Sequence, residues 1–184
     1  MNILVLGDLH FSPNPGYADC FEDRRKTERQ AVLDFIVNQA ADCETVIMLG
    51  DQLHSKNNTS ETLKEFTSFL ERFGNKKVYL LRGNHETFAD GKSALDFLDQ
   101  IKGKHWTVIP NVITTIDDMT FCNYFYKAEL GAETDEEACK KLMEMIPKKG
   151  GVFFAHHAIA GTKVHQTTTD LFAEIVLPRE ELEK

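Results

Sequence analysis

Short apolar runs alternate with helical patterns of apolar residues along the first half of the chain. The runs at residues 3–6, 45–49 and 78–81 are largely apolar, and a glycine follows each of them closely, which indicates buried strands. Between them, apolar residues at helical spacing predict helices over residues 21–41 and around residues 63–73. This alternation of strand and helix predicts a parallel sheet with right-handed crossovers.

The first predicted helix carries apolar side chains that we expect to form one buried face: Val32, Leu33, Ile36, Val37 and Ala40. The second half of the chain shows a more mixed pattern. It predicts a helix near residues 93–100, strands around 107–109, 112–116 and 120–124, a helix over 134–146 and a strand at 152–155. Polar residues predict loops at 13–16 and 161–169, and residues 178–184 resemble the start of a further helix.

Composition and charge narrow the class of protein. The chain has 184 residues, which suits one domain spanning residues 1–184. Its formal net charge of −8 argues against a protein that holds nucleic acid through bulk positive charge, although bound metal cations can supply positive charge locally. The four cysteines form no C-x-x-C pair, and the sequence contains neither a secretory segment nor an apolar run of membrane length. We therefore expect a reduced, soluble, cytoplasmic domain with no membrane contact.

Metal-binding residue types follow four of the predicted strands. Because ligands collect at the carboxyl ends of the strands in open α/β sheets, we expect these four loops to converge. Carboxylates and an Asn carbonyl are hard oxygen ligands, and neutral imidazole suits Mn, Fe, Zn or Ni. A single carboxylate can bridge two cations about 3.5–4 Å apart, as in two-metal phosphoryl-transfer sites. The residues are Asp8 and His10, Asp51 and His54, Asn84, His85 and Glu86, and His156 and His157.

This ordered series, D-x-H, G-D, G-N-H-E and a histidine after a strand, resembles the calcineurin-like metallophosphoesterases. The resemblance implies an αββα double-sheet sandwich and a two-metal site that hydrolyses phosphate esters. It implies that Asp8 and His10 hold one metal, that Asn84 and His156 hold the other, and that Asp51 bridges them. Mn²⁺ is the expected metal, with Fe, Zn or Ni as alternatives.

The resemblance also gives roles to the remaining histidines. His85 would not bind metal but would lie over the two ions and assist the leaving oxygen, oriented by Glu86 or another carboxylate. His156 is preferred to His157 as the ligand because the family ligand comes at the immediate end of its strand.

A narrower similarity follows Asp51. Residues 50–55, then Thr59, Ser60 and the helix after them, resemble SbcD-type DNA-repair nucleases. This likeness implies that His54 positions the substrate, that the substrate is DNA, and that an ATPase subunit is a partner. The basic residues Arg24, Arg25 and Lys26 could then contact the strand. His54 could instead be an exposed loop histidine, and the negative net charge favours a small phosphodiester or phosphomonoester as the alternative substrate.

One family motif is missing. The sequence contains no G-H-x-H, and its nearest candidate is the segment 161–165, which ends in His165. We therefore expect a truncated member of the family or a site that other groups complete. Two alternatives follow from this departure: a catalytically impaired metal-binding module of the same fold, or a homodimer in which a second copy supplies ligands.

Overall fold

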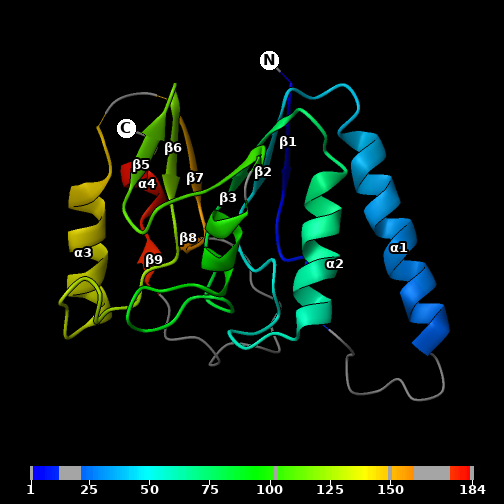
Figure 1. The fold of residues 1–184 in the computed structure, drawn as a ribbon. Helices are drawn as coiled ribbons and strands as arrows, with labels where there is room; N and C mark the ends of the chain where they lie inside the picture. The colour runs from blue at the N-terminus through cyan, green and yellow to red at the C-terminus, as the bar shows by residue number, and fades with distance from the viewer. Residues whose placement is uncertain (1, 13–21, 102, 149–150, 160–174, 183–184) are drawn as a thin grey trace.

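The computed structural model describes residues 2–12, 22–101, 103–148, 151–159 and 175–182. Two helices lie beside a first sheet, a second sheet follows it, and a third helix covers the far side (Figure 1). The order of layers is therefore αββα, as the resemblance to the calcineurin-like metallophosphoesterases implies.

The first sheet contains four parallel strands in the order in which they occur along the chain. These are β1 (Ile3–Leu6), β2 (Thr45–Met48), β3 (Lys77–Leu80) and β4 (Trp106–Val108). Because the strands are parallel, their carboxyl ends lie at the same edge of the sheet. This edge carries three of the four predicted ligand loops.

Helices cover the outer face of the first sheet. They are α1 (Glu22–Gln39), α2 (Ser60–Glu71) and the 3₁₀ helix η1 (Ala94–Gln100). Thr59 caps the start of α2, because its hydroxyl accepts the backbone N–H of Thr62. The core on this side joins Leu33 and Phe66 from the helices to Val46 and other residues of the strands.

The second sheet contains β5 (Thr114–Ile116), β6 (Met119–Cys122) and β7 (Val152–Ala155). β6 runs antiparallel to β5 and parallel to β7. A second apolar core lies between the two sheets, where Ile47 and Leu81 of the first meet Phe121 and Phe154 of the second. This packing fixes the end of β7 relative to the ligand-bearing edge of the first sheet.

A third core lies outside the second sheet, under α3 (Asp135–Met145). Two short strands, β8 (Ala158–Ile159) and β9 (Val176–Leu177), pair in parallel, and α4 (Arg179–Leu182) follows. No helix in the described ranges is long and apolar enough to cross a bilayer.

The predicted elements agree with the structure to within a few residues at most boundaries, with three differences. The segment near residues 93–100 forms a 3₁₀ helix. Val32, expected in the buried face of α1, is 55% exposed, and Phe35 is 61% exposed. The pair β8 and β9 has no counterpart in the sequence analysis. The loops expected at 13–16 and 161–169 lie outside the described residues.

Candidate metal centre

The ends of β1 and β2 remain paired beyond the last strand residues. The backbone N–H of Asp8 donates to the Gly50 carbonyl at 3.1 Å, and that of His10 donates to the Asp51 carbonyl at 3.0 Å. Phe11 continues the pairing by donating to Gln52 at 2.7 Å. These bonds fix the Asp8–His10 loop against the Asp51 loop, so both loops present their polar side chains at one place.

Three residues of these loops have left-handed backbone conformations. Asp8, His10 and Asp51 have φ values of 57°, 48° and 54°. In the described part of the chain, Asp117 is the one other non-glycine residue with positive φ. Such conformations cost about 1–2 kcal/mol per residue and persist where the surrounding structure imposes them, which is common at functional sites.

Asp51 lies at the centre of the group. Its side chain is 6% exposed, and its two carboxylate oxygens face different partners. Oδ2 lies 3.8 Å from both His10 Nε2 and His85 Nε2, whereas Oδ1 lies 3.5 Å from His156 Nε2. Oδ1 also accepts the backbone N–H of His85 at 3.0 Å. A buried carboxylate needs compensation for its charge, and the groups around it here are imidazoles.

His156 brings the second sheet into the site. Its Nδ1 lies 2.9 Å from the carbonyl oxygen of Leu49, so Nδ1 donates there. In the neutral ring, Nε2 then presents a lone pair to Asn84 Oδ1 at 3.0 Å and to Asp51 Oδ1 at 3.5 Å. Three electron-pair donor atoms thus meet, an arrangement that fits a cation between them.

A second group of donor atoms surrounds the other oxygen of Asp51. Asp8, His10 and Asp51 each offer one ligand atom within 4.8 Å of the others, and Asp8 Oδ1 lies 4.0 Å from His10 Nε2. Two ligand atoms that are each about 2.1 Å from one ion are about 3.0–4.2 Å apart, so these separations suit a shared cation. Burial lowers the pKa of His10, which keeps its imidazole neutral and able to bind metal at neutral pH. Both donor groups include Asp51.

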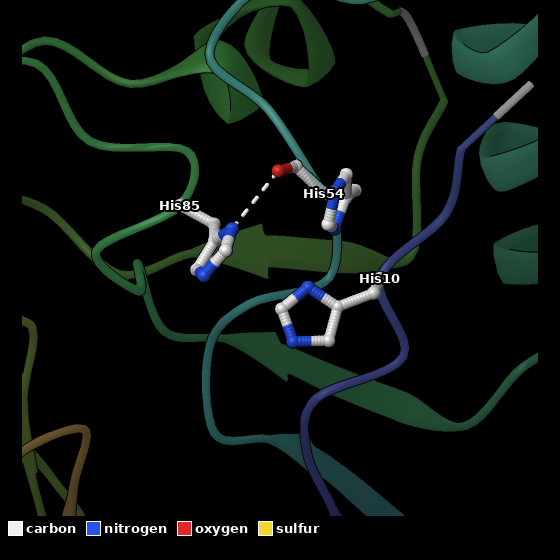
Figure 2. A group of neighbouring side chains, drawn as sticks. All are labelled: His10, His54 and His85. Atoms are coloured by element: carbon white, nitrogen blue, oxygen red, sulfur yellow. Dashed lines mark hydrogen bonds between the residues drawn. The ribbon is translucent and has the colours of Figure 1, made fainter. Parts of the chain in front are cut away.

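His54 and His85 lie next to His10 and form a cluster of three imidazoles (Figure 2). The ring centroids of His10 and His85 are 4.6 Å apart, and His54 is 5.4 Å from each. His85 Nδ1 donates to the backbone carbonyl of His54 at 2.9 Å, which fixes its ring. His54 itself is exposed. One nitrogen of each of the three imidazoles lies within 4.8 Å of the others, close enough for all three to share an ion.

Glu86 differs from its expected role. It is completely buried and accepts two backbone N–H bonds through Oε1, from Gln52 at 3.3 Å and from Gly83 at 3.2 Å. The bonds described for His85 go to His54 and Asp51 instead, so orientation of His85 by Glu86 is not observed. Burial, aided by the charge of Asp51, raises the pKa of Glu86 to about 8. Its contacts tie the Asp51 loop to the Asn84 loop.

Two glycines permit the close approach of these loops. Gly50 has φ of 115°, and a Cβ there would lie 2.6 Å from His156 Nδ1. A Cβ at Gly83 would overlap the carboxylate and backbone of Asp51. Each position therefore requires glycine for packing against the site.

The two adjacent histidines after β7 have different surroundings. His157 is partly buried, stacks on Tyr124 with centroids 5.3 Å apart, and places Nε2 3.0 Å from the carbonyl of Asn123. Burial lowers the pKa of His157 to about 4. His156, and not His157, thus lies beside Asn84 and Asp51. His165 and the side chains of Arg24 and Arg25 lie outside the described residues.

Comparison with known proteins identifies a family. The family model for calcineurin-like phosphoesterases matches residues 1–182. A search of curated proteins gave no match.

Among solved structures, the chain is similar to the nuclease MPE of Pseudomonas putida, with 27% identity and a TM-score of 0.42. That match covers 65% of this chain and 52% of the nuclease, so it spans about half the length of that protein. The match over residues 1–182 shows that the chain belongs to the calcineurin-like phosphoesterase family.

Proposed function

We propose that this phosphoesterase is a two-metal phosphodiesterase that cleaves DNA. Membership of the family supports phosphoester hydrolysis. The observation that carries the two-metal proposal is the position of Asp51, whose Oδ2 faces His10 and whose Oδ1 faces His156. In this proposal Asp8 and His10 would hold one cation, Asn84 and His156 would hold the other, and Asp51 would be a ligand to both.

Divalent cations, when bound, would neutralise the phosphate oxygens and activate the attacking water. The mixture of carboxylate, amide and imidazole ligands suits Mn²⁺, with Fe, Zn and Ni as the alternatives to be tested. Bound cations would also place positive charge at the site, although the chain as a whole has a net charge of −8.

His85 is the proposed general acid. Its Nδ1 is occupied by the His54 carbonyl, so Nε2 is the nitrogen that can deliver a proton to the leaving oxygen. Nε2 lies 3.8 Å from Asp51 Oδ2, so the nitrogen that is not bonded to the backbone faces the proposed bridging carboxylate. The backbone N–H of His85 also holds Asp51, so the acid and the proposed bridging ligand are positioned together.

His54 is the proposed substrate-positioning residue. Its exposed ring lies 5.4 Å from the rings of both His10 and His85, so it flanks the reacting group from the solvent side. This position supports a diester, whose second substituent needs a contact beyond the reacting phosphate. A small phosphodiester remains the alternative substrate.

A second candidate function is a metal-binding module with impaired catalysis. It is favoured by the number of ligands, because each of the two donor groups in the described residues offers three ligands, one of them shared. A second copy of the chain could complete the coordination, which would make metal affinity depend on protein concentration.

The test combines metal content with hydrolysis. The protein is equilibrated with Mn²⁺, freed of excess metal and analysed by mass spectrometry. It is then assayed on single- and double-stranded DNA oligonucleotides, a chromogenic phosphate bis-ester and the matching mono-ester. We expect two ions per chain and cleavage of the oligonucleotides and the bis-ester.

Two variants test the assigned roles. Asp51→Asn should lose bound metal and nearly all turnover, whereas His85→Ala should keep its metal and lose about 10²–10⁴-fold in kcat. Loss of metal in His85→Ala would show that this histidine is a ligand. Bis-ester hydrolysis without cleavage of any oligonucleotide would refute the nuclease proposal, and one ion or none without hydrolysis would favour the binding module.

A further inference from the structure

A lysine lies beside the candidate site, on the loop that follows His54. The Nζ of Lys56 donates to the hydroxyl of Tyr126 at 3.0 Å. The single proton of that hydroxyl faces the backbone carbonyls of both Asn84 and Thr87, each at 3.2 Å. The ammonium group is therefore one hydroxyl away from the backbone of Asn84, a proposed metal ligand.

The ammonium group of Lys56 has no acidic partner in the described part of the chain. Its ammonium lies 5.1 Å from the ring centroid of Tyr126 and 6.0 Å from that of Phe88, distances suited to cation–π attraction. Several other basic groups pair with acids, as in Lys92 with Asp90 and Lys141 with Glu137. Aromatic faces and a hydroxyl fix the position of Lys56, and no carboxylate of the described residues lies within ion-pair distance of its ammonium group.

The ammonium group also keeps hydrogen-bonding capacity. It has three N–H donors, and the contact with Tyr126 uses one of them. The other two are available to an anion that approaches from the site. A fixed cation with free donors, next to a centre that is proposed to bind a phosphate, has the properties of a second phosphate contact.

We propose that Lys56 binds a non-reacting phosphate of a nucleic-acid strand and that Tyr126 holds Lys56 in position for it. This inference rests on the proposed function and extends it, because it specifies a substrate with more than one phosphate. Tyr126 acts as a positioning residue: its hydroxyl connects the lysine to the backbone that carries Asn84.

The test compares four variants with the unchanged protein. Lys56→Gln removes the charge, Lys56→Arg retains it, and Tyr126→Phe removes only the hydroxyl. Lys77→Gln is the matched control, because Lys77 is an exposed lysine at the first residue of β3, at the opposite end of the strand from the site. Binding of a fluorescein-labelled single-stranded oligonucleotide is measured by anisotropy over a range of salt concentrations, together with kcat and KM in Mn²⁺.

We expect Lys56→Gln to raise Kd and KM for the oligonucleotide several-fold and to raise KM for the bis-ester less. The slope of log Kd against log salt should fall by about 0.7, the value for one phosphate contact on a single strand. Lys56→Arg should retain the slope, Tyr126→Phe should weaken binding in the same direction, and Lys77→Gln should behave as the unchanged protein.

An unchanged Kd and salt slope in Lys56→Gln, in a protein that still cleaves oligonucleotides, would overturn this inference and leave the proposed function intact. If the unchanged protein neither binds nor cleaves an oligonucleotide, both this inference and the proposed function are wrong.

Discussion

Glu86 is a buried carboxyl group whose bonds go to the backbone. Its Oε1 accepts the N–H groups of Gln52 and Gly83, which lie next to Asp51 and Asn84. Buried N–H groups that lose their acceptor each cost about 1–3 kcal/mol. Glu86 therefore stabilises the conformation of two loops that carry proposed ligands.

We expect Glu86→Leu to lower the melting temperature and to reduce Mn²⁺ retention, because both N–H groups lose their acceptor. Glu86→Gln keeps a carbonyl oxygen at the same position and should retain metal close to the level of the unchanged protein. Metal content by mass spectrometry and thermal unfolding check both variants. Equal metal content in the Leu and Gln variants would show that these backbone bonds do not support the site.

His157 makes folding stability depend on pH. Its pKa falls from 6.5 to about 4 on folding, mainly through burial. Between these values the unfolded chain binds a proton that the folded protein excludes, so the free energy of unfolding decreases as pH falls from 6.5 to 4. The loss from this residue is at most about 3 kcal/mol.

Denaturant unfolding of the metal-free protein in this pH range measures the effect. His157→Gln, which cannot titrate there, should show a weaker decline in stability with acid. Parallel curves for the two proteins would mean that His157 titrates normally in the folded state.

At the scale of elements, the site depends on the close approach of the turns after β2 and β3 to the end of β7. Gly50 permits this approach, since a Cβ there would lie 2.6 Å from His156 Nδ1 and 2.9 Å from Gly83 Cα. We expect Gly50→Ala to displace His156 and to reduce both metal binding and hydrolysis at least tenfold.

Gly74→Ala is the matched control for this variant. Gly74 also has positive φ, 60°, but a Cβ added there would have no atom within 4 Å. The substitution should cost about 1 kcal/mol of stability through its backbone conformation and leave metal binding unchanged. If both alanine variants retain metal equally, the contact at Gly50 is not needed by the site.

The first three strands of the first sheet can be predicted because each contains a short apolar run that a glycine follows closely, as in Ile3–Leu6 before Gly7. Apolar residues at helical spacing also predict α1 correctly as a helix. The predicted buried face of that helix is too wide, because it includes Val32. Leu33, Ile36 and Ala40 recur at intervals of three and four residues and pack inward. Val32 lies one position outside this stripe, and the rotation of about 100° per residue directs it to solvent.

Other features depend on information that the sequence does not carry locally. Residues Ala94–Gln100 have a capping box formed by Ser93 and Asp96, which resembles an α-helix start, but the segment is short and adopts the tighter 3₁₀ form. The strands β8 and β9 have two residues each, too few to produce an alternating pattern.

In the site, too, some features can be predicted from the sequence and others cannot. The motifs identify Asp8, His10, Asp51, Asn84 and His156, and the structure brings these residues together. The contact of Glu86 with Gln52 and the position of Lys56 beside Tyr126 depend on residues that are 34 and 70 positions apart, which no local motif encodes.

At the scale of the whole molecule, the proposed ligands come from both sheets. Asp8, His10, Asp51 and Asn84 follow strands of the first sheet, whereas His156 follows β7 of the second. A cation bound by residues of both sheets favours the folded state, which holds them together, over the unfolded chain.

We therefore expect Mn²⁺ to raise the melting temperature. At a metal concentration 100 times Kd, mass action adds about 2.7 kcal/mol to the free energy of unfolding. Differential scanning calorimetry with and without Mn²⁺ measures the shift, and Asp51→Asn should abolish it. A shift of equal size in that variant would place the stabilising ion elsewhere.

The bond between His156 Nδ1 and the Leu49 carbonyl joins residues 107 positions apart in the chain. A contact of such sequence separation forms only after much of the chain has been ordered. During synthesis, which proceeds from the amino terminus, Asp8, His10 and Asp51 emerge long before His156. The donor atoms of the second proposed cation therefore come together only once the second sheet has docked, whereas those of the first all follow strands of the first sheet.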